Sequence, residues 1–132
     1  MSIFSWVGRA LRSGSRGFSE YERLVLDAVA EHLPPGIAER FVRRVQAVNL
    51  VQRLDGGREV NCYAMQNGRA VLDSGTRVDA STGERILARF RIDGTPQASN
   101  AGEVWLVDGN LFSIEFRDAT EHAESSQVTA IA

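Results

Sequence analysis

The chain contains no lysine, and all 15 of its basic residues are arginine. The absence of lysine excludes Schiff-base catalysis, a lysine general base and the phosphate-binding loop that depends on a lysine. The single cysteine, Cys62, excludes an internal disulfide and a metal cluster held by several thiolates. The two histidines, His32 and His122, have no cysteine or second histidine at metal-ligand spacing. The sequence therefore predicts neither a metal nor a cofactor, and we identify no catalytic residue in it.

Long apolar runs and a strong charge imbalance are also missing. No apolar run approaches the roughly 20 residues that a helix needs to cross a bilayer. The formal net charge of -2 argues against a nucleic-acid partner, because no overall positive field attracts phosphates. The 132 residues, of which 43% are hydrophobic and 24% charged, have the composition of one soluble globular domain. We expect a cytoplasmic protein, with peripheral attachment to a membrane as the alternative.

Residues 2–12 have the pattern of a short amphipathic helix with a cationic polar face. On a helical wheel Arg9 and Arg12 lie on one side and the apolar residues on the other. The apolar stripe consists of Ile3, Phe4, Trp6, Val7, Ala10 and Leu11. Residues 13–17 have the composition of a flexible linker. Because so short a helix is marginal in water, it needs a surface: its own domain, a partner protein or an anionic membrane.

Two further helices are predicted after this linker. Ser19 and Glu22 form a capping box at the start of the first helix, and the Pro34-Pro35 pair ends it. The second helix begins near Ile37. The residues expected to face the core are Tyr21, Leu24, Ala28, Val29 and Leu33 in the first helix and Ile37, Ala38, Phe41, Val42 and Val45 in the second. The residues expected on the outer side of the second helix are Glu39, Arg40, Arg43 and Arg44.

From about Ala47 the hydrophobic period changes from about 3.6 to about 2, which is typical of strands. Strands are expected at residues 48–54, 59–66, 69–73 and 84–93, and the first three are joined by glycine-containing turns. Residues 74–83 are expected to form a loop. After Arg117 the chain is polar and acidic, and we expect this tail to fray.

The strongest strand signal is a hairpin at residues 104–116 with a tight turn at Asp108-Gly109. With a two-residue loop, one face carries Trp105, Val107, Phe112, Ile114 and Phe116, which we interpret as the floor of the core. A three-residue loop would instead place Trp105 on the face of the sheet opposite Phe112, where it would join the candidate binding surface.

This order of elements predicts an α+β fold in which two N-terminal helices pack on a curved antiparallel sheet of five or six strands. Helices followed by a sheet, at this length, resemble the cone-shaped NTF2-like and cystatin-like architectures. We expect a basic amphipathic segment and linker at residues 1–17, one α+β domain at 18–118 and the tail at 119–132. The sheet face without helices is then solvated or bound to a partner.

The main candidate site is a row of arginines on the strand at residues 84–93. Strict alternation would place Arg85, Arg89 and Arg91 on one side, with Leu87 among them as an apolar anchor. The candidate partner-binding residues are Arg85, Leu87, Arg89, Arg91, Glu115 and Arg117. Arginine binds carboxylates bidentately and is enriched in interfaces, so an acidic protein or peptide is the expected partner. Alternatively, these arginines pair with acidic neighbours and contribute little energy.

Three functions remain open at this point. The favoured hypothesis is a non-enzymatic protein-binding module, either an adaptor or an inhibitor similar in size and surface to bacterial immunity proteins. A second is an NTF2-like pocket protein that binds or transforms a small molecule, in which Tyr63, Glu115 and Arg91 converge. A third is a peripheral membrane protein. The residues that would dock on a partner or membrane are Ile3, Phe4, Trp6, Val7, Arg9, Leu11 and Arg12, and a homo-oligomer is compatible with an exposed edge strand.

Overall fold

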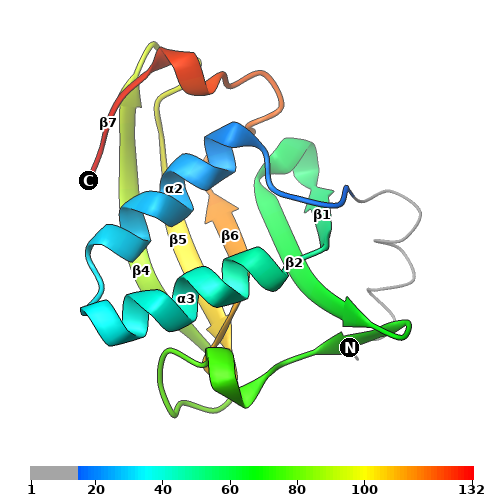
Figure 1. The fold of residues 1–132 in the computed structure, drawn as a ribbon. Helices are drawn as coiled ribbons and strands as arrows, with labels where there is room; N and C mark the ends of the chain where they lie inside the picture. Colours follow the sequence, from blue (N-terminus) through cyan, green and yellow to red (C-terminus); the bar gives the residue numbers. More distant parts are fainter. Residues whose placement is uncertain (1–14) are drawn as a thin grey trace.

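The computed structural model describes residues 15–132, so the predicted amphipathic segment lies outside the described residues. The helices are α2 (Glu20–Glu31) and α3 (Pro35–Ala47). The strands are β1 (Leu50–Leu54), β2 (Glu59–Gln66), β3 (Arg69–Val71), β4 (Glu84–Gly94), β5 (Asn100–Val107), β6 (Asn110–Phe116) and β7 (Val128–Ile131). Both helices lie against the same face of the sheet (Figure 1). The α+β fold is confirmed, with seven strands in the described part of the chain rather than five or six.

The sheet is antiparallel, with strand order β1-β2-β6-β5-β4-β7 and β3 paired with β2. The β5–β6 turn is a two-residue loop in which Asp108 and Gly109 have φ angles of 49° and 80°. Such positive φ angles at both positions are those of a type I′ turn, whose twist matches that of the strands it joins. Within residues 15–132, no helix is long and apolar enough to cross a membrane.

The hairpin formed by β5 and β6 contains a bulge that the alternation of the sequence does not reveal. Next to the turn Val107 pairs with Asn110, as a two-residue loop requires. Leu106 still pairs with Leu111, but the register shifts at the next residue, and Trp105 pairs with Ser113 instead of Phe112. Phe112 is the extra residue, and a bulge of this kind reverses the side to which the following side chains point.

The bulge corrects the predicted core floor. Ile114 and Phe116 are buried in the core beneath the helices. Trp105 and Val107 are only half-buried and line a small hollow together with Phe112 on the other side of the sheet. The prediction that all five side chains share one face is therefore wrong, because the extra residue in β6 separates them.

Helix α2 begins with the predicted capping box. The hydroxyl of Ser19 accepts a hydrogen bond from the Glu22 backbone N–H at 3.1 Å, and the Glu22 carboxylate accepts one from the Ser19 N–H at 2.8 Å. The buried stripe of this helix is turned slightly from the predicted one. It consists of Tyr21, Glu22, Val25, Leu26 and Val29, whereas Leu24, Ala28 and Leu33 are only partly buried.

Helix α3 also differs from its prediction at two positions. Phe41 is fully buried, but Val42, which was expected in the core, is exposed. Arg44, expected on the outer side, is buried, and its guanidinium donates hydrogen bonds to the carbonyl oxygens of Leu111 and Val71, each at 3.0 Å. Burial lowers the pKa of Arg44. A long arginine side chain can thus enter the core when backbone carbonyls receive its charged head.

The C-terminal segment is ordered by the sheet. Ile131 and Ala130 of β7 pair with Ile92 and Asp93 of β4, and the backbones of Ala132 and Arg91 exchange two hydrogen bonds. The prediction that residues 119–132 form a fraying tail is wrong for this stretch, because its end adds a strand to the β4 edge.

Candidate functional site

Helices α2 and α3 lie on one face of the sheet, and we call the opposite face the open face. Val60, Ile114 and Val104 point to the helices, so their neighbours along β2, β6 and β5 point away from them. Side chains of the open face form rows across the strands. The first row consists of Glu59, Glu115, Glu103 and Arg89. The second row consists of Gln52, Asn61, Ser113, Trp105 and Ile86.

The first row places three carboxylates directly opposite one another on adjacent strands. Burial raises the pKa of Glu115, and the negative charges of Glu59 and Glu103 raise it further, while the indole of Trp105 acts in the opposite direction. Like charges at directly opposed positions destabilise a sheet. The three glutamates, which we call the glutamate row, therefore form a local negative potential that a cation would relieve.

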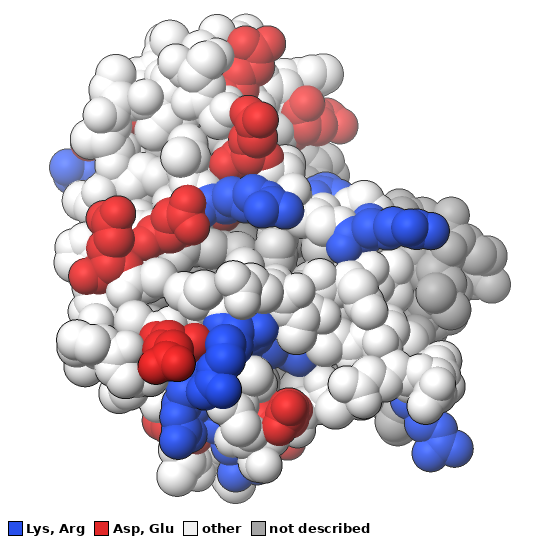
Figure 2. Space-filling view, in the orientation of Figure 1, with Lys and Arg blue, Asp and Glu red and all other residues white. Residues whose placement is uncertain are grey.

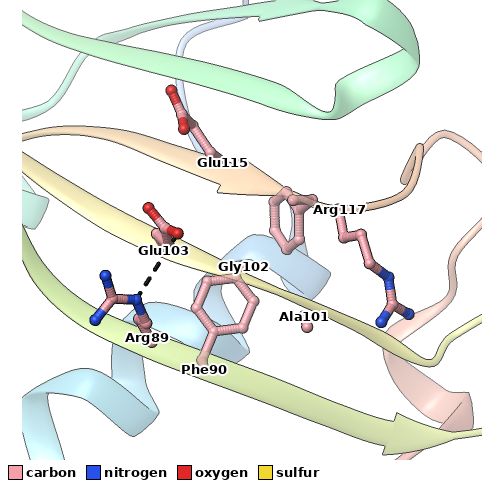
Figure 3. A pocket seen from close by; sticks show the side chains of 8 residues that line it. Arg89, Phe90, Ala101, Gly102, Glu103, Glu115 and Arg117 are labelled. Atoms are coloured by element: carbon pink, nitrogen blue, oxygen red, sulfur yellow. Dashed lines mark ion pairs between the residues drawn. The ribbon is translucent and has the colours of Figure 1, made fainter.

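Arg89 is the cation at the end of this row. Its Nε lies 3.9 Å from a carboxylate oxygen of Glu103, which Figure 3 marks with a dashed line. The Arg89 side chain is 74% exposed, so solvent screens this pair and it offsets little of the repulsion. Figure 3 also shows Glu115 on the neighbouring strand, farther from Arg89 than Glu103 is.

A shallow hollow of about 410 Å³ lies beside the glutamate row, lined partly by Arg89, Glu103, Glu115 and Arg117 (Figure 3). Gly102 shapes it, because a side chain at this position would overlap the carbonyl oxygen of Glu115. The hollow thus combines two acidic and two basic side chains over a backbone floor.

Apolar groups continue the open face beyond the charges. Trp105 and Ile86 are half-buried at the end of the second row. Phe112 packs edge-on against Tyr63, with ring centroids 5.7 Å apart, and both belong to a second hydrophobic cluster with Leu50. The open face therefore offers aromatic surface, which is enriched at the centre of protein interfaces, next to concentrated charge, which is typical of their polar rim.

Buried polar groups without partners occur on the same face. Among residues 15–132, the side chain of Gln52 and the hydroxyl of Tyr63 have no hydrogen-bond partner, and both residues are only 1% exposed. Burial also raises the pKa of Tyr63 to about 12. A buried polar group without a partner costs free energy, and most buried polar groups in native proteins have one.

The predicted row of arginines on β4 is divided by a second bulge. The register of β4 against β5 shifts between Ile86 and Ala88, so Arg85 pairs with Leu106, a core residue. Arg85 thus lies on the helix side, where it forms an ion pair with Asp79 at 2.7 Å.

Leu87, the predicted anchor among the arginines, packs against the core instead. Arg89 and Arg91 stay on the open face, opposite Glu103 and Ala101. The premise that Arg85, Leu87, Arg89 and Arg91 share one side is therefore wrong, because the extra residue interrupts the alternation. Of the predicted partner-binding residues, the structure brings together Arg89, Glu115 and Arg117.

The three residues of the alternative pocket are not brought together. Tyr63 pairs with Leu50 on β1, and Arg91 pairs with Ala101 on β5. Glu115 borders two hollows, and neither is lined by Tyr63 or Arg91.

Other reactive groups in the described residues are buried or isolated. Cys62 is fully buried, its thiol lies 3.2 Å from the carbonyl oxygen of Phe112, and burial raises its pKa to about 12. A thiol in this state is not an effective nucleophile. Within residues 15–132, no three His, Cys, Asp or Glu side chains are grouped to hold a metal ion.

The helix side differs from the open face in its charge distribution. Acidic and basic side chains are interspersed there over α2 and α3, with uncharged surface between them (Figure 2). The fold and the site together define a two-layer α+β protein whose open face carries the glutamate row, arginines beside it and aromatic side chains. No protein-family model, curated protein sequence or solved structure matches the chain.

Proposed function

We propose that this protein is a non-enzymatic protein-binding module whose open face receives a basic segment of a partner protein. The observation that carries the proposal is the glutamate row of Glu59, Glu115 and Glu103, three like charges in register beside the half-buried Trp105. Nothing in the packing of the core requires acidic side chains at these positions, because they point away from it.

The chemistry of the face indicates which partner group fits. A lysine or arginine placed near Glu115 and Glu103 would remove the repulsion between them and gain charge-assisted hydrogen bonds. Trp105 lies in the row next to these residues and can receive the same cation on its ring face, since tryptophan is the strongest cation–π acceptor. This partner is basic, whereas the row of arginines inferred from the sequence would favour an acidic one.

Two roles are compatible with such a face. An adaptor holds a partner near another protein, whereas an inhibitor of the immunity type blocks the activity of its partner. We expect either role to be carried out in the cytoplasm or at the surface of a membrane. The activity of the partner, measured with and without the module, distinguishes the two roles.

The test compares affinity captures by the full-length wild type and two charge-reversed variants in an extract of the native host. Glu103→Arg/Glu115→Arg reverses the open face, and Glu31→Arg/Glu39→Arg makes the same charge change at exposed positions on the helix side. We expect a partner that the wild type and the helix-side variant retain and the open-face variant loses. Retention by all three proteins, or loss from both variants, would contradict the proposal.

A third variant tests the acidic partner that the sequence suggests. Arg89→Glu/Arg91→Glu should retain the partner or bind it more tightly, because it adds negative charge to the open face. If this variant alone loses the partner, the face binds acidic groups and our assignment is wrong. The captured partner is then purified, and isothermal titration should give a dissociation constant that increases with salt.

A further inference from the structure

The chain itself contains a segment with the chemistry that the open face would bind. Residues 2–12, outside the described residues, combine an apolar stripe with Arg9 and Arg12. We infer that this segment occupies the open face when no partner is bound, with its arginines against the glutamate row and its apolar residues over Trp105 and Phe112. The inference rests on the proposed function, since it takes the open face as the binding surface.

The described chain begins at a fixed place on the sheet. Ser15 forms an isolated bridge to Val51, with Ser15 N–H to Val51 oxygen at 2.8 Å and Val51 N–H to Ser15 oxygen at 2.7 Å. The guanidinium of Arg53 also donates to the hydroxyl of Ser15 at 2.6 Å and to the carbonyl of Gly17 at 3.1 Å. The attachment point of the segment is therefore fixed at the outer edge of β1.

The bridge also fixes the direction of the backbone at Ser15. Because the bridge is antiparallel, the chain at Ser15 runs opposite to β1 and its upstream direction is toward Leu54. Leu54 pairs with Glu59, the first residue of the glutamate row. At Ser15 the backbone therefore points upstream toward the end of β1 where the row begins, three residues beyond Val51.

The three-residue separation between Arg12 and Ser15 limits how far apart they lie. An extended chain covers about 3.3–3.6 Å per residue, so the Arg12 backbone can lie about 10 Å from the bridge, which is the distance from Val51 to Leu54 along β1. Neighbouring strands are about 4.8 Å apart and Ser15 lies outside β1, so Glu59 and Glu115 are about 10 Å and 14 Å farther across the sheet. The linker therefore brings Arg12 to the β1 end of the glutamate row, and the segment before it has to cross the remaining distance.

The open face has charged and apolar groups that a docked segment could cover. The cation that the described residues place at the glutamate row, Arg89, is 74% exposed, and Trp105 and Phe112 are only half-buried. A docked segment would supply cations to the glutamates and apolar area to Trp105 and Phe112. Because the segment is tethered, its effective concentration at the face is high, and a partner must displace it. Binding would then release the amphipathic stripe.

The test uses the tryptophan fluorescence of the full-length chain. The protein has two tryptophans, and Trp6→Phe leaves Trp105 as the single reporter on the open face. In this background, Arg9→Glu/Arg12→Glu should shift the Trp105 emission to longer wavelength and increase its quenching by acrylamide several-fold. Arg23→Glu/Arg40→Glu makes the same charge change at exposed positions on the helix side and should change neither quantity.

A charge swap separates docking from a general loss of structure. Glu103→Arg/Glu115→Arg in the same background should also expose Trp105, and its combination with Arg9→Glu/Arg12→Glu should restore the low quenching. Equal quenching of Trp105 in all of these proteins would overturn the inference. So would quenching that depends on protein concentration, because a second copy would then cover the face.

The alternative is that residues 2–12 bind a membrane instead of the open face, and vesicles of phosphatidylglycerol and phosphatidylcholine test it. Cosedimentation that is lost in Arg9→Glu/Arg12→Glu, together with unchanged Trp105 quenching, would place the segment on lipid and overturn the inference.

The two proposals can fail independently of each other. If partner capture depends on the open face but Trp105 quenching does not change in Arg9→Glu/Arg12→Glu, the proposed function stands and the inference is wrong. If Trp105 quenching changes but capture does not depend on the open face, the segment docks there and the proposed function is wrong.

Discussion

Replacing Arg53 with methionine should strongly destabilise the protein, because it leaves the carboxylate of Glu22 buried without its counter-charge. Glu22 on α2 is 1% exposed, and both of its oxygens accept hydrogen bonds from the Arg53 guanidinium, each at 2.7 Å. This two-point contact joins α2 to β1. Arg53 also holds the start of the described chain through Ser15 and Gly17, and these bonds are lost together with the ion pair.

The magnitude follows from the burial of the two partners. Removing one partner of a buried ion pair costs about 3–5 kcal/mol. Arg53 retains 29% exposure, and Glu22 keeps the hydrogen bond from the Ser19 N–H, so we expect the lower end of this range. A loss of about 3 kcal/mol is a large share of the stability of a small domain and lowers Tm by roughly 10 °C.

Urea denaturation followed by tryptophan fluorescence measures the effect. Arg85→Met is the matched control, because Arg85 and Asp79 also form an ion pair at 2.7 Å. Their side chains are 49% and 28% exposed, so the loss of this ion pair should cost less than about 1 kcal/mol. Glu22→Gln/Arg53→Met should be more stable than Arg53→Met, since it removes the unpaired charge. Equal losses in Arg53→Met and Arg85→Met would refute the argument from burial.

Two further predictions concern the open face and the backbone beneath it. The folded protein raises the pKa of Glu115 above its ordinary 4.5, so ionisation of this carboxyl group destabilises the fold as pH rises above 4.5. Glu115→Gln should therefore have a higher Tm than the wild type at neutral pH. Below pH 4.5 the two proteins should have the same Tm, because Glu115 is then protonated in both the folded and the unfolded state. Gly102→Ala should destabilise the protein by about 1–3 kcal/mol, because the added methyl group would overlap the Glu115 carbonyl and the Phe90 ring. Gly36→Ala is the control in the same thermal melts. Gly36 lies in α3 with open space around it, so this substitution should stabilise the protein by about 0.5–1 kcal/mol.

Local chemistry explains which parts of the fold were predictable. The capping box depends on Ser19 and Glu22 alone, and the β5–β6 turn depends on the tolerance of Asp108 and Gly109 for positive φ. Such features are determined by residues next to each other in the chain. The burial of Arg44 was not predictable in this way, because the carbonyls that receive it come from distant strands.

The errors about the candidate site have one physical cause. Each bulge adds one residue to a strand, at Leu87 in β4 and at Phe112 in β6, and an alternating pattern cannot show which residue is extra. A signal was nevertheless present in β5, which has no extra residue. Val104 and Leu106 are its purely apolar pair, so Glu103 and Trp105 had to share the other face.

The composition of the open face also bears on why the glutamate row exists. At the Glu22–Arg53 contact, the chain places a buried carboxylate against an arginine and satisfies both oxygens. Along the row it places Glu59, Glu115 and Glu103 side by side, and the ion pair at its end is with the largely exposed Arg89. Neutral polar residues would fit the same positions without repulsion, so the row lowers the stability of the isolated fold. Departures from the rules of stable packing concentrate where a protein binds something, and a basic partner is the species that would turn this cost into affinity.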